Sequence, residues 1–201
     1  MSSSQPGDAA AAAAQTPSHD VLPADLPVPV NDGATDHLRA MQLPQIALPS
    51  TSGGAVSLGG LNGLTVVYAY PRTGEPGKPS PDGWDAIPGA RGCTPQSCSF
   101  RDHFAELRGL GVDHVFGLST QTTDYQSEMA ERLHLPFAIL SDHAFTLTDA
   151  IRLPTFEAGG MRLLKRFTLV IDNGRVAHVF YPVFPPDRSA QDVVDWLKAR
   201  A

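Results

Sequence analysis

The residues of this sequence best suited to chemistry are its two cysteines, Cys93 and Cys98, which lie five positions apart. Beside them, Thr94 is a favourable helix N-cap and Pro95 suits the first position of a helix. We therefore predict a helix that begins here, with Cys93 just before it and Cys98 in its first turns. Unpaired N–H groups and the positive end of the helix dipole favour a negative group at a helix N-terminus. Cys93 is thus expected to react as a thiolate.

The spacing of the two cysteines predicts a change of structure on oxidation. In an ideal helix, Cα atoms five residues apart are separated by roughly 8 to 9 Å, which exceeds the usual disulfide reach of about 7 Å. A disulfide therefore requires the first turns to unwind, which suggests a cycle between a folded reduced state and a partly melted oxidised state. The alternative is a buried core residue at Cys98 and an inert loop thiol at Cys93. Three arginines nearby in sequence are candidates to stabilise a thiolate, namely Arg72, Arg91 and Arg101.

Composition and charge argue against several functional classes. The 201 residues include 21 acidic side chains against 15 Lys and Arg, without a basic block, so nucleic-acid binding is not expected. No apolar run approaches the roughly 20 residues of a membrane span, and the N-terminus lacks the positive start of a secretory signal. We expect a cytoplasmic protein, in which a cysteine pair is more often catalytic than structural. The cysteines and histidines show no metal-ligand spacing, so neither a metal nor an organic cofactor is expected.

Hydrophobic periodicity predicts the elements that position the cysteines. Residues 1–36 are rich in Ala and Pro without periodicity and predict a flexible arm, whereas residues 37–201 predict one domain. Strands are expected at 45–48, 55–58, 64–70, 115–119, 137–140, 166–171 and 175–180. Helices are expected through 100–107, from a capping box at 123–126, near 145–153 and after an N-cap at Ser189. This order implies an α/β domain with a central mixed β-sheet flanked by helices on both faces.

Two connections carry further signals. Asp172-Asn173-Gly174 is a strong turn sequence for a β-hairpin between the last two strands. The Gly- and Pro-rich segment 71–92 predicts a long loop that leads to Cys93, and a long ordered loop in a small domain usually serves function. Trp84 and Asp85 within this loop are expected to anchor the loop, to shield the thiol or to dock a reductant.

A cysteine-bearing helix start after the first buried strand of such a domain is the arrangement of a thioredoxin-like fold. In segment 92–102, Gly-Cys-Thr is followed by a second Cys five residues after the first and then by Phe-Arg-Asp. This segment resembles the peroxiredoxins, most closely the bacterioferritin-comigratory or Q-type group. The resemblance extends from about Leu43 to the C-terminus.

The resemblance implies roles for three residues. Cys93 corresponds to the peroxidatic cysteine, which peroxide oxidises to a sulfenic acid, and Cys98 to the resolving cysteine that then forms the disulfide. Arg166 corresponds to the arginine that stabilises the thiolate and orients the peroxide. An arginine on a buried strand needs an anionic partner, which in the alternative interpretation is a carboxylate such as Asp102.

The implied activity is reduction of hydrogen peroxide or organic hydroperoxides, with thioredoxin or a similar dithiol as reductant, in a monomer or weak dimer. The alternatives are a redox-sensing thioredoxin-like domain and a protein disulfide oxidoreductase, both without peroxide turnover. A disulfide oxidoreductase normally has a Cys-x-x-Cys pair, which this sequence lacks.

The sequence departs from the family pattern in one respect. Peroxiredoxins carry Thr three residues before the peroxidatic cysteine and Pro seven residues before it, where this chain has Ala90 and Ala86. Thr73 can supply the missing hydroxyl if the long loop folds back, and Thr94 can supply it from beside the thiolate. The sequence does not decide between Thr73, Thr94 and the absence of such a hydroxyl.

Overall fold

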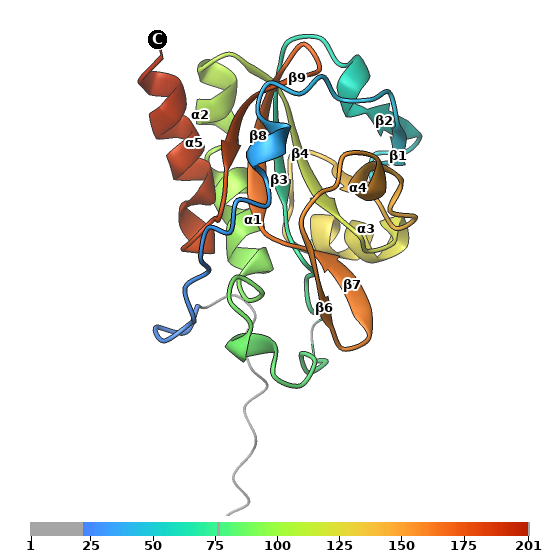
Figure 1. The fold of residues 1–201 in the computed structure, drawn as a ribbon, viewed down its shortest axis with the longest axis vertical. Coiled ribbons are helices and arrows are strands. Elements are labelled where there is room, and N and C mark those ends of the chain that lie inside the picture. The colour runs from blue at the N-terminus through green and yellow to red at the C-terminus, as the bar shows by residue number, and fades with distance from the viewer. Residues whose placement is uncertain (1–21, 76, 201) are drawn as a thin grey trace, which may run out of the picture.

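A five-stranded mixed sheet forms the centre of the computed structural model, which describes residues 22–75 and 77–200 (Figure 1). Its strands are β3 (Leu64–Ala69), β4 (Val112–Ser119), β5 (Ile139–Ser141), β8 (Phe167–Asp172) and β9 (Arg175–Phe180). They lie in the order β5-β4-β3-β8-β9. The pairs β3–β4 and β4–β5 are parallel, whereas β3–β8 and β8–β9 are antiparallel. The predicted turn between β8 and β9 is confirmed, because Asn173 and Gly174 both have positive φ.

Helices cover both faces of the sheet, which confirms the predicted α/β architecture. They are α1 (Cys93–Asp102), α2 (Phe104–Gly109), α3 (Thr123–Arg132), α4 (Thr146–Ala150) and α5 (Ser189–Lys198). Alternate side chains of β3 enter two separate cores: Tyr68 packs in the core with α1 and α5, and Val67 packs in the core with α4. Short 3-10 turns η1 (Asp36–Leu38), η2 (Leu58–Gly60) and η4 (Pro186–Arg188) flank these elements. No helix among the described residues is long and apolar enough to cross a membrane.

Two small hairpins lie outside the central sheet. The first joins β1 (Ala47–Pro49) to β2 (Ala55–Ser57), close to the predicted strands. The second joins β6 (Thr155–Ala158) to β7 (Met161–Leu164) and was not predicted, although the Gly-Gly pair at 159–160, where both residues have positive φ, is a hairpin signal.

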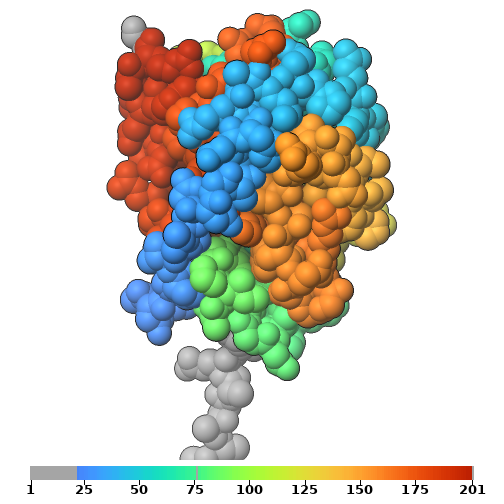
Figure 2. Space-filling view, in the orientation of Figure 1, coloured from blue at the N-terminus to red at the C-terminus, as the bar shows by residue number. Residues whose placement is uncertain are grey.

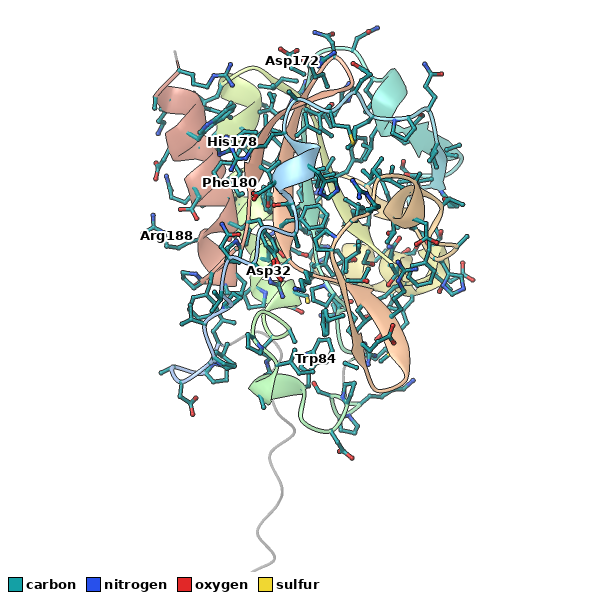
Figure 3. All side chains as sticks on the ribbon, viewed as in Figure 1. Asp32, Trp84, Asp172, His178, Phe180 and Arg188 are labelled. Atoms are coloured by element: carbon teal, nitrogen blue, oxygen red, sulfur yellow. The ribbon has the colours of Figure 1, made fainter. Side chains whose placement is uncertain are left out.

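The β6–β7 hairpin anchors the long loop that leads to Cys93. Trp84, in the 3-10 turn η3 (Trp84–Ala86), is only 5% exposed and packs with Ala90 and Leu163 of β7. Its ring centroid lies 6.2 Å from that of Phe156 on β6. Figure 3 shows Trp84 between the loop and the hairpin. The loop is therefore held in place by an apolar cluster of its own.

The cysteine-bearing helix begins two residues earlier than predicted, at Cys93 and not at Pro95. Gly92 precedes α1 with a φ of 101°, a left-handed conformation that glycine adopts without a steric penalty. Cys93 is consequently the first residue of α1, and the prediction of Thr94 as the N-cap is wrong. The predicted helix through Leu107 is also interrupted at His103, whose ring Nδ1 donates to the carbonyl oxygen of Ser99 at 2.8 Å.

Two other predicted N-caps, at Thr123 and Ser189, are also wrong. Thr123 is the first residue of α3 rather than its N-cap, and the Gln126 side chain donates to the carbonyl oxygen of Leu140 at 2.9 Å instead of closing a capping box. Ser189 is the first residue of α5, and its hydroxyl is hydrogen-bonded to side chains of α1 and β8. In both cases a contact with a distant element replaces the local cap.

Residues 22–36, which fall within the predicted arm, lie along the surface of the domain, and residues 1–21 are outside the described residues. Figure 2 shows this segment, in blue, crossing between α5 and the β6–β7 hairpin. Asp32, labelled in Figure 3, fixes it. Lys165 Nζ donates to its Oδ2 at 2.6 Å, and the Tyr181 hydroxyl donates to its Oδ1 at 2.7 Å.

The Asp32 contacts generate a pH-dependent prediction. The hydrogen bond from Lys165, followed by that from Tyr181, lowers the pKa of Asp32 from 3.8 to about 2. The pKa of Asp32 is lower in the folded state than in the unfolded state. The contribution of the Asp32 contacts to folding stability is therefore complete above about pH 5 and is lost as the pH falls toward 2. Asp32 is 47% exposed, so we expect Asp32→Asn to lower the free energy of unfolding at pH 7 by only about 0.5 kcal/mol.

Urea denaturation at pH 7 and near pH 2 measures this difference. The variant is expected to match the wild type at the lower pH. Asp25→Asn, an exposed change in the same segment, serves as the control. An equal loss of stability at both pH values would contradict the assignment.

Candidate active site

The sulfur of Cys93 lies beside a buried positive charge at the start of α1. The Cys93 side chain is 4% exposed, and Arg166 Nη2 lies 3.2 Å from its Sγ. The thiol itself is directed to the carbonyl oxygen of Ala90, 3.6 Å away. An adjacent guanidinium and the positive end of a helix both favour the anionic form of the sulfur. This geometry suits a nucleophilic thiolate.

Arg166, which immediately precedes β8, is 3% exposed and has neutral oxygens as its other acceptors. Its Nη2 donates to the carbonyl oxygens of Ala90, at 3.2 Å, and Arg91, at 3.1 Å. Its Nη1 donates to Gln96 Oε1. Among the described residues, no carboxylate lies within ion-pair distance of Arg166. The Cys93 sulfur is the ionisable group among its acceptors, so the thiolate would balance the buried charge.

The alternative partner for Arg166 was Asp102, and this interpretation is wrong. Asp102 accepts a hydrogen bond from Arg101 Nε at 2.8 Å. That contact is the main cause of a raised pKa at Arg101, and Cys98 adds to the shift. Arg101 therefore lies near Cys98 and not Cys93, whereas the other two candidate arginines, Arg72 and Arg91, line the cavity at Cys93.

Gln96 positions Arg166 and was missed by the sequence reasoning. Its side chain is fully buried in α1. While Oε1 accepts from Arg166, Nε2 donates to Ser189 Oγ at 3.2 Å, and Ser189 Oγ lies 3.1 Å from Thr168 Oγ1. This chain of hydrogen bonds connects α1, β8 and α5. A polar residue three positions after Cys93, one helical turn away, was the available signal.

Aromatic packing fixes α1 on the sheet. Tyr68 of β3 stacks on Phe100 of α1 with ring centroids 4.4 Å apart and an interplanar angle of 7°. The Tyr68 hydroxyl also donates to Ser97 Oγ at 3.1 Å. Burial raises the pKa values of Tyr68 and Tyr70 above 10, so both phenols stay neutral. The two tyrosines beneath α1 therefore add no negative charge that would disfavour a thiolate at Cys93.

Cys98 lies half-buried on the same continuous helix as Cys93, and the two cysteines do not form a disulfide in this structure. With α1 intact between them, five residues of helix hold the two Cα atoms beyond the usual disulfide reach. The reduced geometry thus agrees with the expectation that a disulfide requires the first turns of α1 to unwind.

A cavity of about 90 Å³ opens onto Cys93. This volume is enough for a few water-sized groups, which suits the reacting end of a peroxide. Its lining includes Trp84 and both candidate hydroxyl residues, Thr73 and Thr94. The loop does fold back toward the thiol, as the Thr73 hypothesis requires.

Thr73 is held in the wall of this cavity from the opposite side of the site. Gln121 Oε1 accepts from the Thr73 amide at 3.0 Å and from its hydroxyl at 3.3 Å, while Gln121 Nε2 donates to the Thr73 carbonyl oxygen at 3.3 Å. The Tyr125 hydroxyl also donates to that carbonyl oxygen, at 2.9 Å. These contacts span about 50 residues in sequence, so no local pattern identifies them.

Comparison with known proteins identifies relatives over most of the chain. The profile of the redoxin family matches residues 39–195. The chain is 31% identical over 163 residues to peroxiredoxin Bcp of Escherichia coli K12, covering 79% of this chain and 94% of that protein. It is 29% identical over 158 residues to chloroplastic peroxiredoxin Q of Sedum lineare, covering 78% of this chain and 75% of that protein.

Solved structures share the fold. The peroxidoxin BcpB of Mycobacterium tuberculosis has a TM-score of 0.64 at 24% identity, covering 81% of this chain and 97% of that one. The bacterioferritin comigratory protein of Xanthomonas campestris has a TM-score of 0.59 at 19% identity, covering 88% of this chain and 99% of that chain. The thioredoxin-like fold predicted from the sequence is thereby confirmed.

Proposed function

Because the chain belongs to the redoxin family and, within it, to the peroxiredoxins of the Bcp and Q type, we propose that it reduces peroxides at Cys93. The chain is a thiol-dependent peroxidase. In our assignment Cys93 is the peroxidatic cysteine, Cys98 the resolving cysteine and Arg166 the residue that stabilises the thiolate. The observation that carries this assignment is the 3.2 Å contact between buried Arg166 Nη2 and Cys93 Sγ.

The first half-reaction oxidises Cys93. Its thiolate attacks the terminal oxygen of the peroxide, forming an S–O bond as the O–O bond breaks. The leaving oxygen takes up a proton and departs as water or an alcohol, and Cys93 becomes a sulfenic acid. Arg166 stabilises the negative charge, first on sulfur and then on the oxygens between which the bond breaks.

The second half-reaction restores the thiol in two steps. The Cys98 thiolate attacks the sulfenic sulfur of Cys93, an S–S bond forms, and the hydroxyl leaves as water after taking up a proton. This step requires the first turns of α1 to unwind, with loss of helical hydrogen bonds. An external dithiol then reduces the disulfide through a mixed disulfide and is itself oxidised.

We assign the substrate-binding hydroxyl to Thr73. Because its O–H donates to Gln121 Oε1, its oxygen lone pairs are free to accept the O–H of a peroxide in the cavity. Ala90, at the position of the usual threonine, has no side-chain hydroxyl. Because the Thr73 hydroxyl hydrogen is used in the bond to Gln121 Oε1, the Thr73 oxygen acts as an acceptor toward the peroxide.

The proposal extends to the reductant, the compartment and the oligomeric state of the protein. We propose thioredoxin or a similar dithiol protein as the reductant, because each cycle leaves a disulfide that needs two electrons. A cytoplasmic location fits this requirement, since that compartment keeps thiols reduced. We further propose that the chain works as a monomer or weak dimer, because the proposed catalytic residues all belong to one chain.

Steady-state turnover with thioredoxin and its reductase tests the proposed function. Wild type is expected to consume hydrogen peroxide continuously, and Cys93→Ser to lose this activity because its nucleophile is absent. Cys98→Ser is expected to react once and then stall or accept a small thiol as reductant. Loss of peroxide reactivity in Cys98→Ser with retention in Cys93→Ser would reverse the assignment, and no turnover in wild type would refute it.

The Thr73 assignment is tested by comparing Thr73→Val with Thr73→Ser. The valine variant removes the hydroxyl at nearly constant volume, so the rate constant for hydrogen peroxide is expected to fall by about tenfold, corresponding to one lost hydrogen bond. The serine variant keeps the hydroxyl and is expected to remain near the wild-type rate. Stopped-flow kinetics of the reduced protein measures both, and equal rates in all three proteins would remove Thr73 from the mechanism.

A further inference from the structure

Cys98 lies beside a positive charge of its own, on the second half of α1. Arg101 follows Cys98 by three positions, about one helical turn further on, so the two side chains lie on the same side of the helix. The Arg101 guanidinium interacts with the Cys98 sulfur both through a hydrogen bond and through its charge. The pair parallels the contact between Arg166 and Cys93, but at the thiol that the first half-reaction does not use.

Two further hydrogen bonds hold the Arg101 guanidinium in place. Its Nη1 donates to the carbonyl oxygen of Leu133, at the C-terminal end of α3, at 3.0 Å. The negative end of the α3 dipole favours a cation at this point. Its Nε donates to Asp102 Oδ1 at 2.8 Å, but the Asp102 side chain is 60% exposed, so water and salt screen that pair. The guanidinium is therefore fixed beside Cys98 and keeps much of its charge.

The two halves of α1 are held by different parts of the domain. In the first half, Gln96 accepts a hydrogen bond from Arg166, which unwinding of the first turns would break. In the second half, Phe100 stacks on an aromatic ring of β3, and Arg101 binds the end of α3. The second half can thus stay docked while the first half opens. Arg101 then remains beside Cys98 during the step in which Cys98 attacks.

Other ionisable groups around Cys98 lie on the neighbouring elements. Tyr68 of β3, which interacts with Cys98, stays neutral because burial raises its pKa well above 10. On the α5 side, the ring of His103 is hydrogen-bonded to α1 and to α5. At the end of α3, Glu131 and His134 line a surface groove whose lining does not include Cys98. The guanidinium thus supplies the positive charge at the Cys98 sulfur.

We infer that Arg101 is a catalytic residue of the second half-reaction, because it holds Cys98 in the thiolate form that attacks the sulfenic acid. This inference rests on the proposed function. The Cys98 thiol gives its proton to solvent, and its sulfur keeps the electron pair that forms the S–S bond. As that bond forms, the S–O bond at Cys93 breaks, and hydroxide leaves as water after taking up a proton. Arg101 stabilises the negative charge on sulfur until the disulfide has formed.

Alkylation by iodoacetamide in a Cys93→Ser background tests the contact without peroxide, because Cys98 is then the one thiol of the chain. At pH 7, Arg101→Gln is expected to slow alkylation by about fivefold, a modest factor because the guanidinium is partly exposed. At about pH 10 the two rates should converge, since a cysteine ordinarily ionises near pH 8.5 and is a thiolate in both proteins. Arg101→Lys keeps the charge and should give an intermediate rate.

Arg132→Gln is the matched control. Arg132 also pairs with a carboxylate on its own helix, Glu128, with its Nε 2.7 Å from Oε1. This variant removes a charge of the same kind away from Cys98, so its alkylation rate should match that of the background protein at both pH values.

The lifetime of the Cys93 sulfenic acid tests the role of Arg101 in the cycle. With both cysteines present, Arg101→Gln is expected to be oxidised at the wild-type rate, because the Arg166 contact is intact. It should then form the disulfide about fivefold more slowly at pH 7. Rapid-quench mass spectrometry, with dimedone to trap the sulfenic acid, measures both steps.

Equal alkylation rates at pH 7 in Arg101→Gln and the background protein would overturn the inference. A slowing of the same size at both pH values would also overturn it, because that result reports exposure of the thiol and not its ionisation. An unchanged sulfenic acid lifetime in an active Arg101→Gln protein would do so as well, with the peroxidase assignment intact. Failure of wild type to consume any peroxide would instead refute the proposed function and this inference together.

Discussion

The proposed active site depends on a buried guanidinium that has no carboxylate partner among the described residues. Burying an unpaired charge is costly unless hydrogen bonds and an opposite charge compensate it. Arg166 has two carbonyl oxygens, one amide oxygen and the sulfur of Cys93 as acceptors. In the proposed mechanism, a Cys93 thiolate would supply the missing negative charge. The stability of the site and the reactivity of the thiol are therefore linked through the same contact.

The rest of the domain brings these acceptors to one point. The long loop supplies the carbonyl oxygens of Ala90 and Arg91, and α1 supplies Cys93 and Gln96. Arg166 itself immediately precedes β8. The β6–β7 hairpin fixes the loop through Trp84, and Tyr68 fixes α1 on the sheet. In the proposed cycle, the start of α1 must then open for the disulfide to form. The cycle would thus combine a rigid reduced site with a helix start that can unwind.

The sequence predicts the central sheet, the order of elements and the cysteine pair, because these depend on local periodicity and spacing. It misplaces the caps at Thr94, Thr123 and Ser189, where a left-handed glycine or a distant hydrogen bond replaces the local one. The β6–β7 hairpin is missed because its strands are short and pack mainly on the loop. The contacts of Gln96 and of Thr73 with Gln121 join remote segments, which no local pattern encodes.

The most direct test of the link between Arg166 and Cys93 is the rate of Cys93 alkylation by iodoacetamide at pH 7, in a Cys98→Ser background that leaves one thiol. If Arg166 stabilises the thiolate, Arg166→Gln should slow alkylation by at least about tenfold. Arg166→Lys should give an intermediate rate, and Arg175→Gln, at an exposed arginine of β9, should match the background. Equal alkylation rates in folded Arg166→Gln and in the background protein would contradict the account.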